Sequence, residues 1–150
     1  MTIKDAKDII KNQLLKDIAL LPKAERVTVE YPKSIENYQL TAPTAAYLIV
    51  YKGGKYSESK TPNIVLQDKD MEISVVIVSK NLAGKTCEEH IDFIADSVAG
   101  IEIDGMRPDG KIIPVSDEWI DETDGVWKYA ITFKVPVDFI EKEARAKLTN

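Results

Sequence analysis

Three consecutive residues, Gly84, Lys85 and Thr86, are the strongest hint of chemistry, because they follow an apolar segment and open a helical pattern. In many nucleotide-binding proteins such a triplet ends the loop that holds phosphate with backbone N–H groups and the lysine. That loop also requires a glycine five positions before Gly84, where this chain has Ser79. The residues between them include no glycine that would let the backbone curl around a phosphate. We therefore interpret the triplet as a helix start, and a small nucleotide-binding enzyme stays an alternative.

Cys87 and His90 lie three residues apart on the same predicted helix and could share one face. A zinc site would need two more ligands, and the chain has no other cysteine or histidine to supply them. A catalytic cysteine usually meets its histidine from a different element of the fold. We expect an ordinary, half-exposed helix face here, without a metal, a cofactor or a nucleophile.

The most acidic stretch, residues 116–125, contains Asp117, Glu118, Asp121 and Glu122. It lacks the alternating spacing of oxygen ligands that a calcium loop requires. Paired carboxylates could also hydrolyse glycosides, but nothing in the sequence would raise the pKa of one above that of another. We interpret the stretch as a solvated turn before the last strand.

The composition bounds the class of protein to which this chain belongs. The 150 residues are 44% hydrophobic, which suffices for one buried core. The longest apolar run, residues 45–51, is too short to span a membrane, and the N-terminal residues do not resemble a secretion signal. One cysteine cannot form an internal disulfide, so we expect synthesis in the cytoplasm and no membrane partner. The net charge of −5, with scattered lysines and arginines, does not favour nucleic-acid binding.

The hydrophobic periodicity predicts the elements that would position these residues. Residues 3–21 and the segment from Thr86 to about Ala99 have the apolar spacing of amphipathic helices, and Thr86 with Glu89 forms a capping box. Strands are predicted, in chain order, at residues 27–31, 45–51 (covered on both faces), 71–79, 111–115 (an edge strand, because of Pro114) and 126–135.

Two further segments have weaker patterns. Residues 55–69 are polar and mixed, and we interpret them as a long excursion in the form of an extended hairpin arm. Residues 137–148 predict a terminal helix with Phe139, Ile140 and Ala144 pointing inward. In the last strand, alternation places Trp127 with Tyr129, Ile131, Phe133 and Val135 on the core face. The whole chain thus predicts a single α+β domain, residues 1–150, with a mostly antiparallel sheet of four to five strands and two main helices on one face.

This order of elements resembles the tail-terminator-like protein family of Mu-like phages and related contractile-tail particles. The resemblance covers nearly the whole chain, and its best local match is the segment Ser79, Lys80, Asn81, Leu82. It is carried by the opening helix IKDAKDIIKNQLL, the strand AAYLIVYKGG, the strand and turn MEISVVIVSKNLAG, the helix EEHIDFIADSVAGIEIDG and the last strand GVWKYAITFKVPV.

The resemblance implies a subunit of a ring, a homo-hexamer, that ends the tail tube and sheath and joins them to the neck. Its partners would be other copies of the chain, the tube and sheath proteins, and a neck or head-completion protein. The resemblance implies no catalytic residues, and we expect no enzyme activity. DNA would pass through the ring without specific binding, because an acidic surface repels phosphates. The chain would be made in the host cytoplasm and assembled into a virion or phage-like particle.

Two surfaces are predicted to make these contacts. An arm at residues 52–69 would contact the adjacent subunit or the tube, through Lys52, Gly53, Gly54, Lys55, Tyr56 and Lys60. The acids Asp117, Glu118, Asp121 and Glu122 would lie at the lumen or at the rim that faces the neck. A cytoplasmic adaptor protein with the same fold stays open as a further alternative, because a fold does not determine a function.

Overall fold

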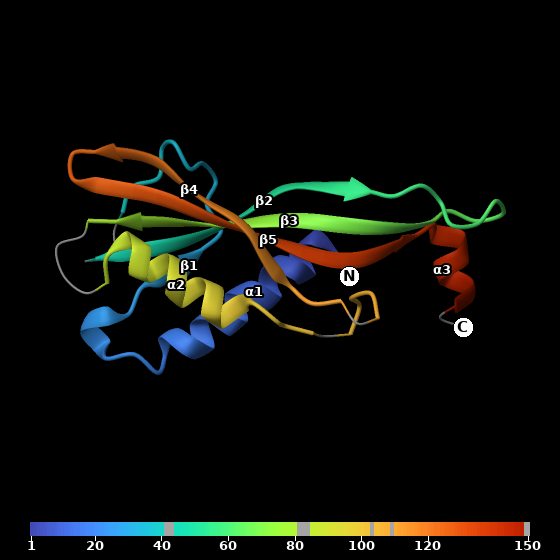
Figure 1. Cartoon of the computed structure of the whole chain (residues 1–150), viewed down its shortest axis with the longest axis horizontal. Helices are drawn as coiled ribbons and strands as arrows, with labels where there is room; N and C mark the ends of the chain where they lie inside the picture. The colour runs from blue at the N-terminus through green and yellow to red at the C-terminus, as the bar shows by residue number, and fades with distance from the viewer. Residues whose placement is uncertain (41–43, 81–84, 103, 109, 149–150) are drawn as a thin grey trace.

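The computed structural model describes residues 1–40, 44–80, 85–102, 104–108 and 110–148 (Figure 1). Its described strands form one sheet in the order β1-β2-β3-β5-β4. β1 (Thr28–Glu30) runs parallel to β2 (Ala45–Tyr56). All other neighbours are antiparallel, with β3 at Leu66–Ser79, β4 at Ile113–Thr123 and β5 at Val126–Ile140. The predicted α+β class with a mostly antiparallel sheet is confirmed.

The two main helices pack on one face of this sheet, as predicted. α1 (Ile3–Ile18) and α2 (Cys87–Val98) both begin at capping boxes, Thr2 with Asp5 and Thr86 with Glu89. α1 ends before the predicted residue 21, because the side chain of Arg26 binds the carbonyl oxygens of Ala19 and Leu21 and holds the chain in a turn. A single 3-10 turn, η1 (Lys23–Glu25), leads from this turn to β1.

The core lies between these helices and the sheet. Ile10 and Leu14 of α1 and Ile94 and Val98 of α2 are fully buried against side chains such as Phe133 of β5. A smaller cluster on the opposite face contains Ala46 and Leu48 of β2, Val76 and Val78 of β3, and Ala130 of β5. The segment at residues 35–40 packs over it through Ile35, Tyr38 and Leu40. Strand β2 is therefore covered on both faces at its start, as its continuous apolar run predicted.

One half of the sheet projects beyond the helices as an arm (Figure 1). The arm consists of the end of β2, the start of β3 and the end of β5, and it carries α3 (Lys142–Leu148) at its tip. The predicted hairpin is confirmed, but the predicted helix from residue 137 begins later, because β5 stays paired with β3 as far as Ile140. Phe139 is consequently 38% exposed on a strand, and only Ala144 of the predicted inward residues is buried.

The edge strand predicted at residues 111–115 is present, because β4 begins at Ile113 and lies at the edge of the sheet, but the turn predicted at residues 116–125 was wrong. The acidic stretch is not a turn but most of strand β4, which pairs with β5 from Ile113 to Thr123. The turn is limited to Asp124 and Gly125, whose φ angles of 52° and 80° suit a two-residue hairpin. Trp127, predicted as a core residue, is 37% exposed, because it lies in the outermost part of β5 beside this turn.

Truncation of Phe133 should show how strongly the sheet and the helices depend on one another. Phe133 is fully buried, so Phe133→Ala should lower the free energy of unfolding by about 3–5 kcal/mol. Leu20, which is 82% exposed, provides a matched control, and Leu20→Ala should cause little change. Chemical denaturation measures both values. A small loss for Phe133→Ala would contradict the assignment of this core.

Candidate assembly surfaces

The structure gives Lys85 and Thr86 local roles. Thr86 caps α2, where its side chain accepts a hydrogen bond from the N–H of Glu89. The ammonium group of Lys85, which precedes the helix, lies 5.5 Å from the centroid of the Phe93 ring on α2. Gly84 lies outside the described residues, as do Asn81 and Leu82 of the local family match. What is described of this segment is therefore the start of a helix.

Cys87 and His90 are not on a half-exposed face, as the sequence predicted, but buried, each with 3% exposure. Together with Ile94 and Val98 they form the stripe of α2 that faces the sheet. The Nδ1 atom of His90 lies 2.6 Å from the hydroxyl oxygen of Tyr47 on β2, a partner that helix periodicity alone could not reveal.

Burial keeps both side chains uncharged. It lowers the pKa of His90 to about 4, and the nearby positive charge of Lys85 acts in the same direction. It also raises the pKa of the Cys87 thiol, which keeps the thiol protonated and a poor nucleophile. The pair therefore acts as part of the core.

The described residues were also searched for a metal centre and for a membrane helix. Within these ranges no group of three or more His, Cys, Asp or Glu side chains is placed to hold a metal ion. In the same part of the chain no helix has the length and apolarity to cross a membrane.

Strand β4 forms one outer edge of the sheet and is exposed along almost its whole length. Among the described residues it pairs only with β5, so its other side offers free backbone groups. Trp119 is 56% exposed and Val115 is 48% exposed, and together with the exposed Ile113 and Ile120 they place several large apolar side chains on one edge strand. We call residues 113–123 the acidic edge, because they also contain Asp117, Glu118, Asp121 and Glu122.

The acids of this edge have few partners within the chain. None of Asp117, Glu118 and Asp121 forms an ion pair with a described residue, and Oδ1 of Asp121 is buried without a described hydrogen-bond partner. Glu122 accepts a hydrogen bond of 2.7 Å from the N–H of Gly125 and so stabilises the hairpin turn.

The second surface lies on the arm. β1 pairs with β2 only at Ala46, Tyr47 and Leu48, so the outer side of β2 is unpaired from residue 49 to residue 56 among the described segments. We call residues 49–56 the basic edge, because Lys52 and Lys55 are its only charged residues. β2 has a β-bulge at Lys52. The next residue, Gly53, has a φ of 154°, an angle that glycine adopts more readily than other residues.

Interactions within the arm keep it extended. The guanidinium of Arg107 donates hydrogen bonds of 2.5 Å to Oδ1 of Asp70 and 3.1 Å to the carbonyl oxygen of Val137. Lys60, one of the predicted interface residues, forms an ion pair of 2.6 Å with Asp68 and lowers the pKa of that carboxyl group. The ammonium of Lys69 lies over the ring of Tyr56, which also contacts the ring of Phe139 edge-on. Specific side-chain interactions therefore hold the arm in its extended form.

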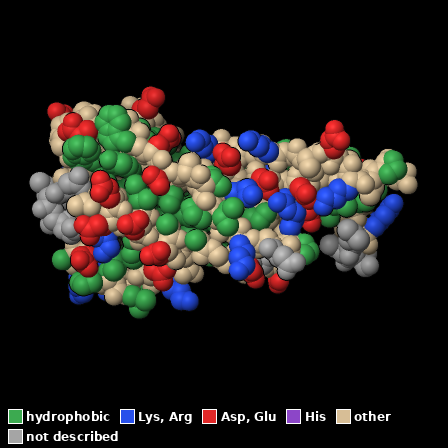
Figure 2. Space-filling model, viewed as in Figure 1, with side chains coloured by type: hydrophobic (Ala, Val, Ile, Leu, Met, Phe, Trp, Pro, Cys, Tyr) green, Lys and Arg blue, Asp and Glu red, His purple; other side chains and the backbone are tan. Residues whose placement is uncertain are grey.

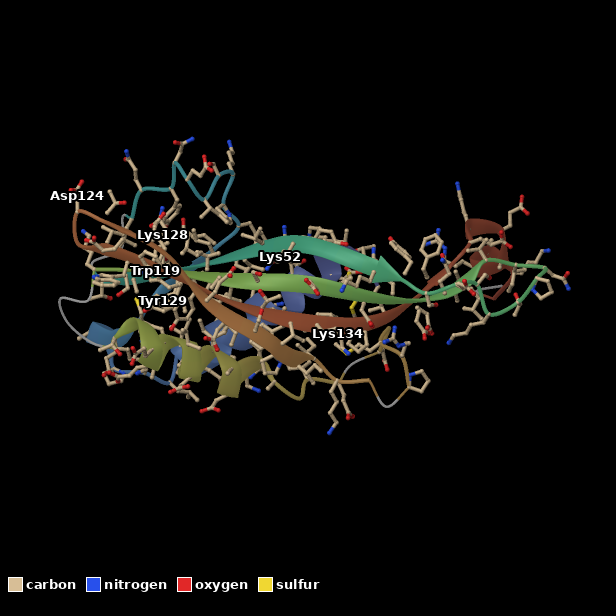
Figure 3. All side chains as sticks on the ribbon, turned by 45° about the horizontal axis from the view of Figure 1, so that its top comes forward. Lys52, Trp119, Asp124, Lys128, Tyr129 and Lys134 are labelled. Atoms are coloured by element: carbon tan, nitrogen blue, oxygen red, sulfur yellow. The ribbon has the colours of Figure 1, made fainter. Side chains whose placement is uncertain are left out.

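The structure separates the two predicted surfaces within one chain. The acidic edge and the basic edge are opposite sides of the sheet, with β3 and β5 between them. In the face shown by Figure 2, Asp and Glu side chains predominate over the helical body, and many Lys and Arg side chains follow the arm. Figure 3 shows Trp119 of the acidic edge in the body, near Asp124, and Lys52 of the basic edge nearer the arm.

Comparison with known proteins adds independent information. The model of the family described as Gp37 protein matches residues 18–149. A chain in a solved structure entitled "Virion of native gene transfer agent (GTA) particle" has a similar fold, with a TM-score of 0.54 and 13% sequence identity. The similarity covers 89% of this chain and 94% of that chain. No curated protein matches. These findings support the resemblance to tail-terminator-like proteins drawn from the sequence.

The buried imidazole predicts how stability depends on pH. His90 has an ordinary pKa of 6.5 when exposed, and burial lowers it to about 4. As the pH falls from 6.5 toward 4, the unfolded chain binds a proton that the folded chain does not, so up to about 3 kcal/mol of stability is lost. His90→Gln, which does not titrate, should show a flatter dependence when unfolding is measured between pH 7 and pH 4.5. Equal slopes for both proteins would contradict the buried, neutral imidazole.

Proposed function

The chain belongs to the Gp37 protein family, and on that premise we propose that it is a structural subunit of a phage-like particle. The fold that it shares with a chain of a gene transfer agent virion supports this proposal. The burial of Cys87 and His90 supports it too, because both side chains are uncharged in the core. The function would then depend on the surfaces of the molecule and not on a catalytic site.

The specific role that we propose is a homo-hexameric ring that ends the tail tube and sheath and joins them to the neck. The observation that carries this role is β4, an edge strand that exposes Trp119 and Val115 beside unpaired backbone groups. Such an edge on an isolated monomer would promote unspecific pairing, whereas neighbouring proteins in an assembly would cover it.

Each predicted surface has a place in this ring. The arm, with Lys52, Gly53, Gly54, Lys55, Tyr56 and Lys60, would contact the adjacent subunit or the tube. The acids Asp117, Glu118, Asp121 and Glu122 would lie at the lumen or at the neck-facing rim. Their charge would repel the phosphates of DNA and let it pass without specific binding.

The alternative functions have less support. A nucleotide-binding enzyme would need Lys85 to reach a phosphate, whereas its ammonium lies over the ring of Phe93. A cytoplasmic adaptor would have the same fold, and it would differ from a ring subunit in whether it is incorporated into particles. An adaptor would be absent from purified particles, and a ring subunit would be present in a fixed number of copies.

The composition of purified particles tests the proposed function directly. We expect quantitative mass spectrometry to find the chain at about six copies per tail, the copy number of a sixfold ring. Removal of its gene should give tails of irregular length that do not join heads, as seen by electron microscopy. Particles that lack the chain, or normal tails without the gene, would exclude this role.

Shortening the arm tests its contact with the neighbour or the tube. Replacing residues 57–65 by Asn-Gly leaves a short loop, Asn-Gly followed by residues 66–68, between the paired residues Tyr56 and Lys69, and removes no paired residue of β2 or β3. We expect the shortened chain to fold but to fail in complementing a gene deletion. Lys85→Ala is the matched control and should complement fully, because no step of ring assembly involves a nucleotide. Normal tails from the shortened chain would remove the arm from the proposal.

A further inference from the structure

The sheet ends in two free edges of opposite charge. The acidic edge, residues 113–123, contains four carboxylates and no lysine or arginine. The basic edge, residues 49–56, contains Lys52 and Lys55 and no carboxylate. Among the described residues, neither lysine forms an ion pair or a side-chain hydrogen bond within the chain. Among the described residues, the acids of one edge therefore have no basic partner within the chain, and the lysines of the other edge have no acidic partner.

We propose that the acidic edge of one copy pairs with the basic edge of the next copy, so that the sheets of neighbouring subunits join into one. This inference rests on the proposed ring and states which surfaces form its subunit interface. The contact is head-to-tail, because each copy contributes a different edge on its two sides. Contacts of this kind continue from copy to copy until the ring closes.

Strand direction favours this junction. β2 runs antiparallel to β3, β3 to β5, and β5 to β4, so β4 and β2 point in opposite directions. When the sheet of one copy continues into that of the next, β4 therefore meets the neighbouring β2 in antiparallel orientation. Two strands in this orientation can form a regular ladder of backbone hydrogen bonds.

Each edge has a regular segment in which such a ladder can form. Bulges interrupt β4 at both ends of residues 116–119, and the bulge in β2 precedes residues 53–56. Glu118 pairs with Ala130, a residue of the cluster on the face away from the helices. Lys55 lies opposite Asp70, next to Met71 of the helix-side core, and alternation places it on the face away from the helices as well. Glu118 and Lys55 would thus lie on the same face of the joined sheet.

The two edges are offset along the strands. Ile49, where the basic edge begins, is level with Asp117 through the paired residues Val75 and Ile131. Because residues 53–56 lie further toward the arm, pairing them with residues 116–119 of a neighbour requires a stagger between copies. Closed sheets have this stagger, which tilts their strands relative to the axis of closure. The acids Asp121 and Glu122 lie beyond the second bulge and outside this ladder, so the junction does not require them.

Edge lysines, bulges and prolines also occur where a protein prevents pairing, and β4 contains Pro114. The apolar side chains argue against a purely protective role. Ile113, Val115, Trp119 and Ile120 of the acidic edge are 36–56% exposed, and Tyr56 of the basic edge is 52% exposed. A protected edge needs no such surface, whereas a junction between subunits would bury it.

Reversal of the charges tests the junction. Asp117→Lys with Glu118→Lys should weaken self-association of the purified chain by about tenfold or more, and Lys52→Glu with Lys55→Glu should do the same, because each change brings like charges together. A chain with all four changes should associate again. Sedimentation and light scattering over a range of concentrations measure each species. Pairing of β4 with β4 would not be rescued in the fourfold variant, so rescue supports contact between different edges.

Cysteine cross-linking identifies the contacting edges independently of charge. A mixture of Glu118→Cys and Lys55→Cys chains should form a disulfide-linked dimer of the two different chains under mild oxidation, and neither chain should do so alone. The native Cys87 is buried and does not interfere. Cross-linking of either variant with itself would overturn the proposal, as would a wild-type chain that stays monomeric at every concentration. The chain could be found in particles although no change at either edge alters its self-association. That result would overturn the junction and leave the proposed function standing.

Discussion

The pairing of β3 with β5 is the constraint on which the rest of the structure depends. The two strands pair without interruption from Leu66 with Ile140 to Ser79 with Trp127. At one end they carry the core residues that face α1 and α2, and at the other end they form the centre of the arm. A slip of one residue would turn Phe133 and Ile77 away from the helices, so the burial of the core fixes the register of the arm too.

This central pair also decides where the free edges lie. β2 and β4 flank it on opposite sides, and each is left unpaired over part of its outer side among the described residues. The helices cover one face of the body and add nothing to either edge. The fold therefore buries groups that could be reactive, such as Cys87 and His90, and exposes groups suited to contact, such as Trp119 and Tyr56. These exposed groups suit the proposed assembly with neighbouring proteins.

The sequence predicted those elements whose own residues determine them. The alternation in β5, the apolar run of β2 and the capping box at Thr86 are local signals, and the corresponding elements formed as expected. It failed where a distant partner decides the outcome. β4 looks like a polar turn because its acids need no burial on an edge, and only its pairing with β5 makes it a strand. His90 looked half-exposed because its partner, Tyr47, comes from another element 43 residues away.

The same distinction explains why the sequence indicated two surfaces but not their relation. The lysines at 52–55 and the acids at 117–122 are visible as runs of charge, whereas their position on opposite edges of one sheet follows only from the strand order. Opposite charges on two different edges favour one arrangement, because joining like edges would place acid against acid or lysine against lysine. Electrostatics would therefore select the order of the copies.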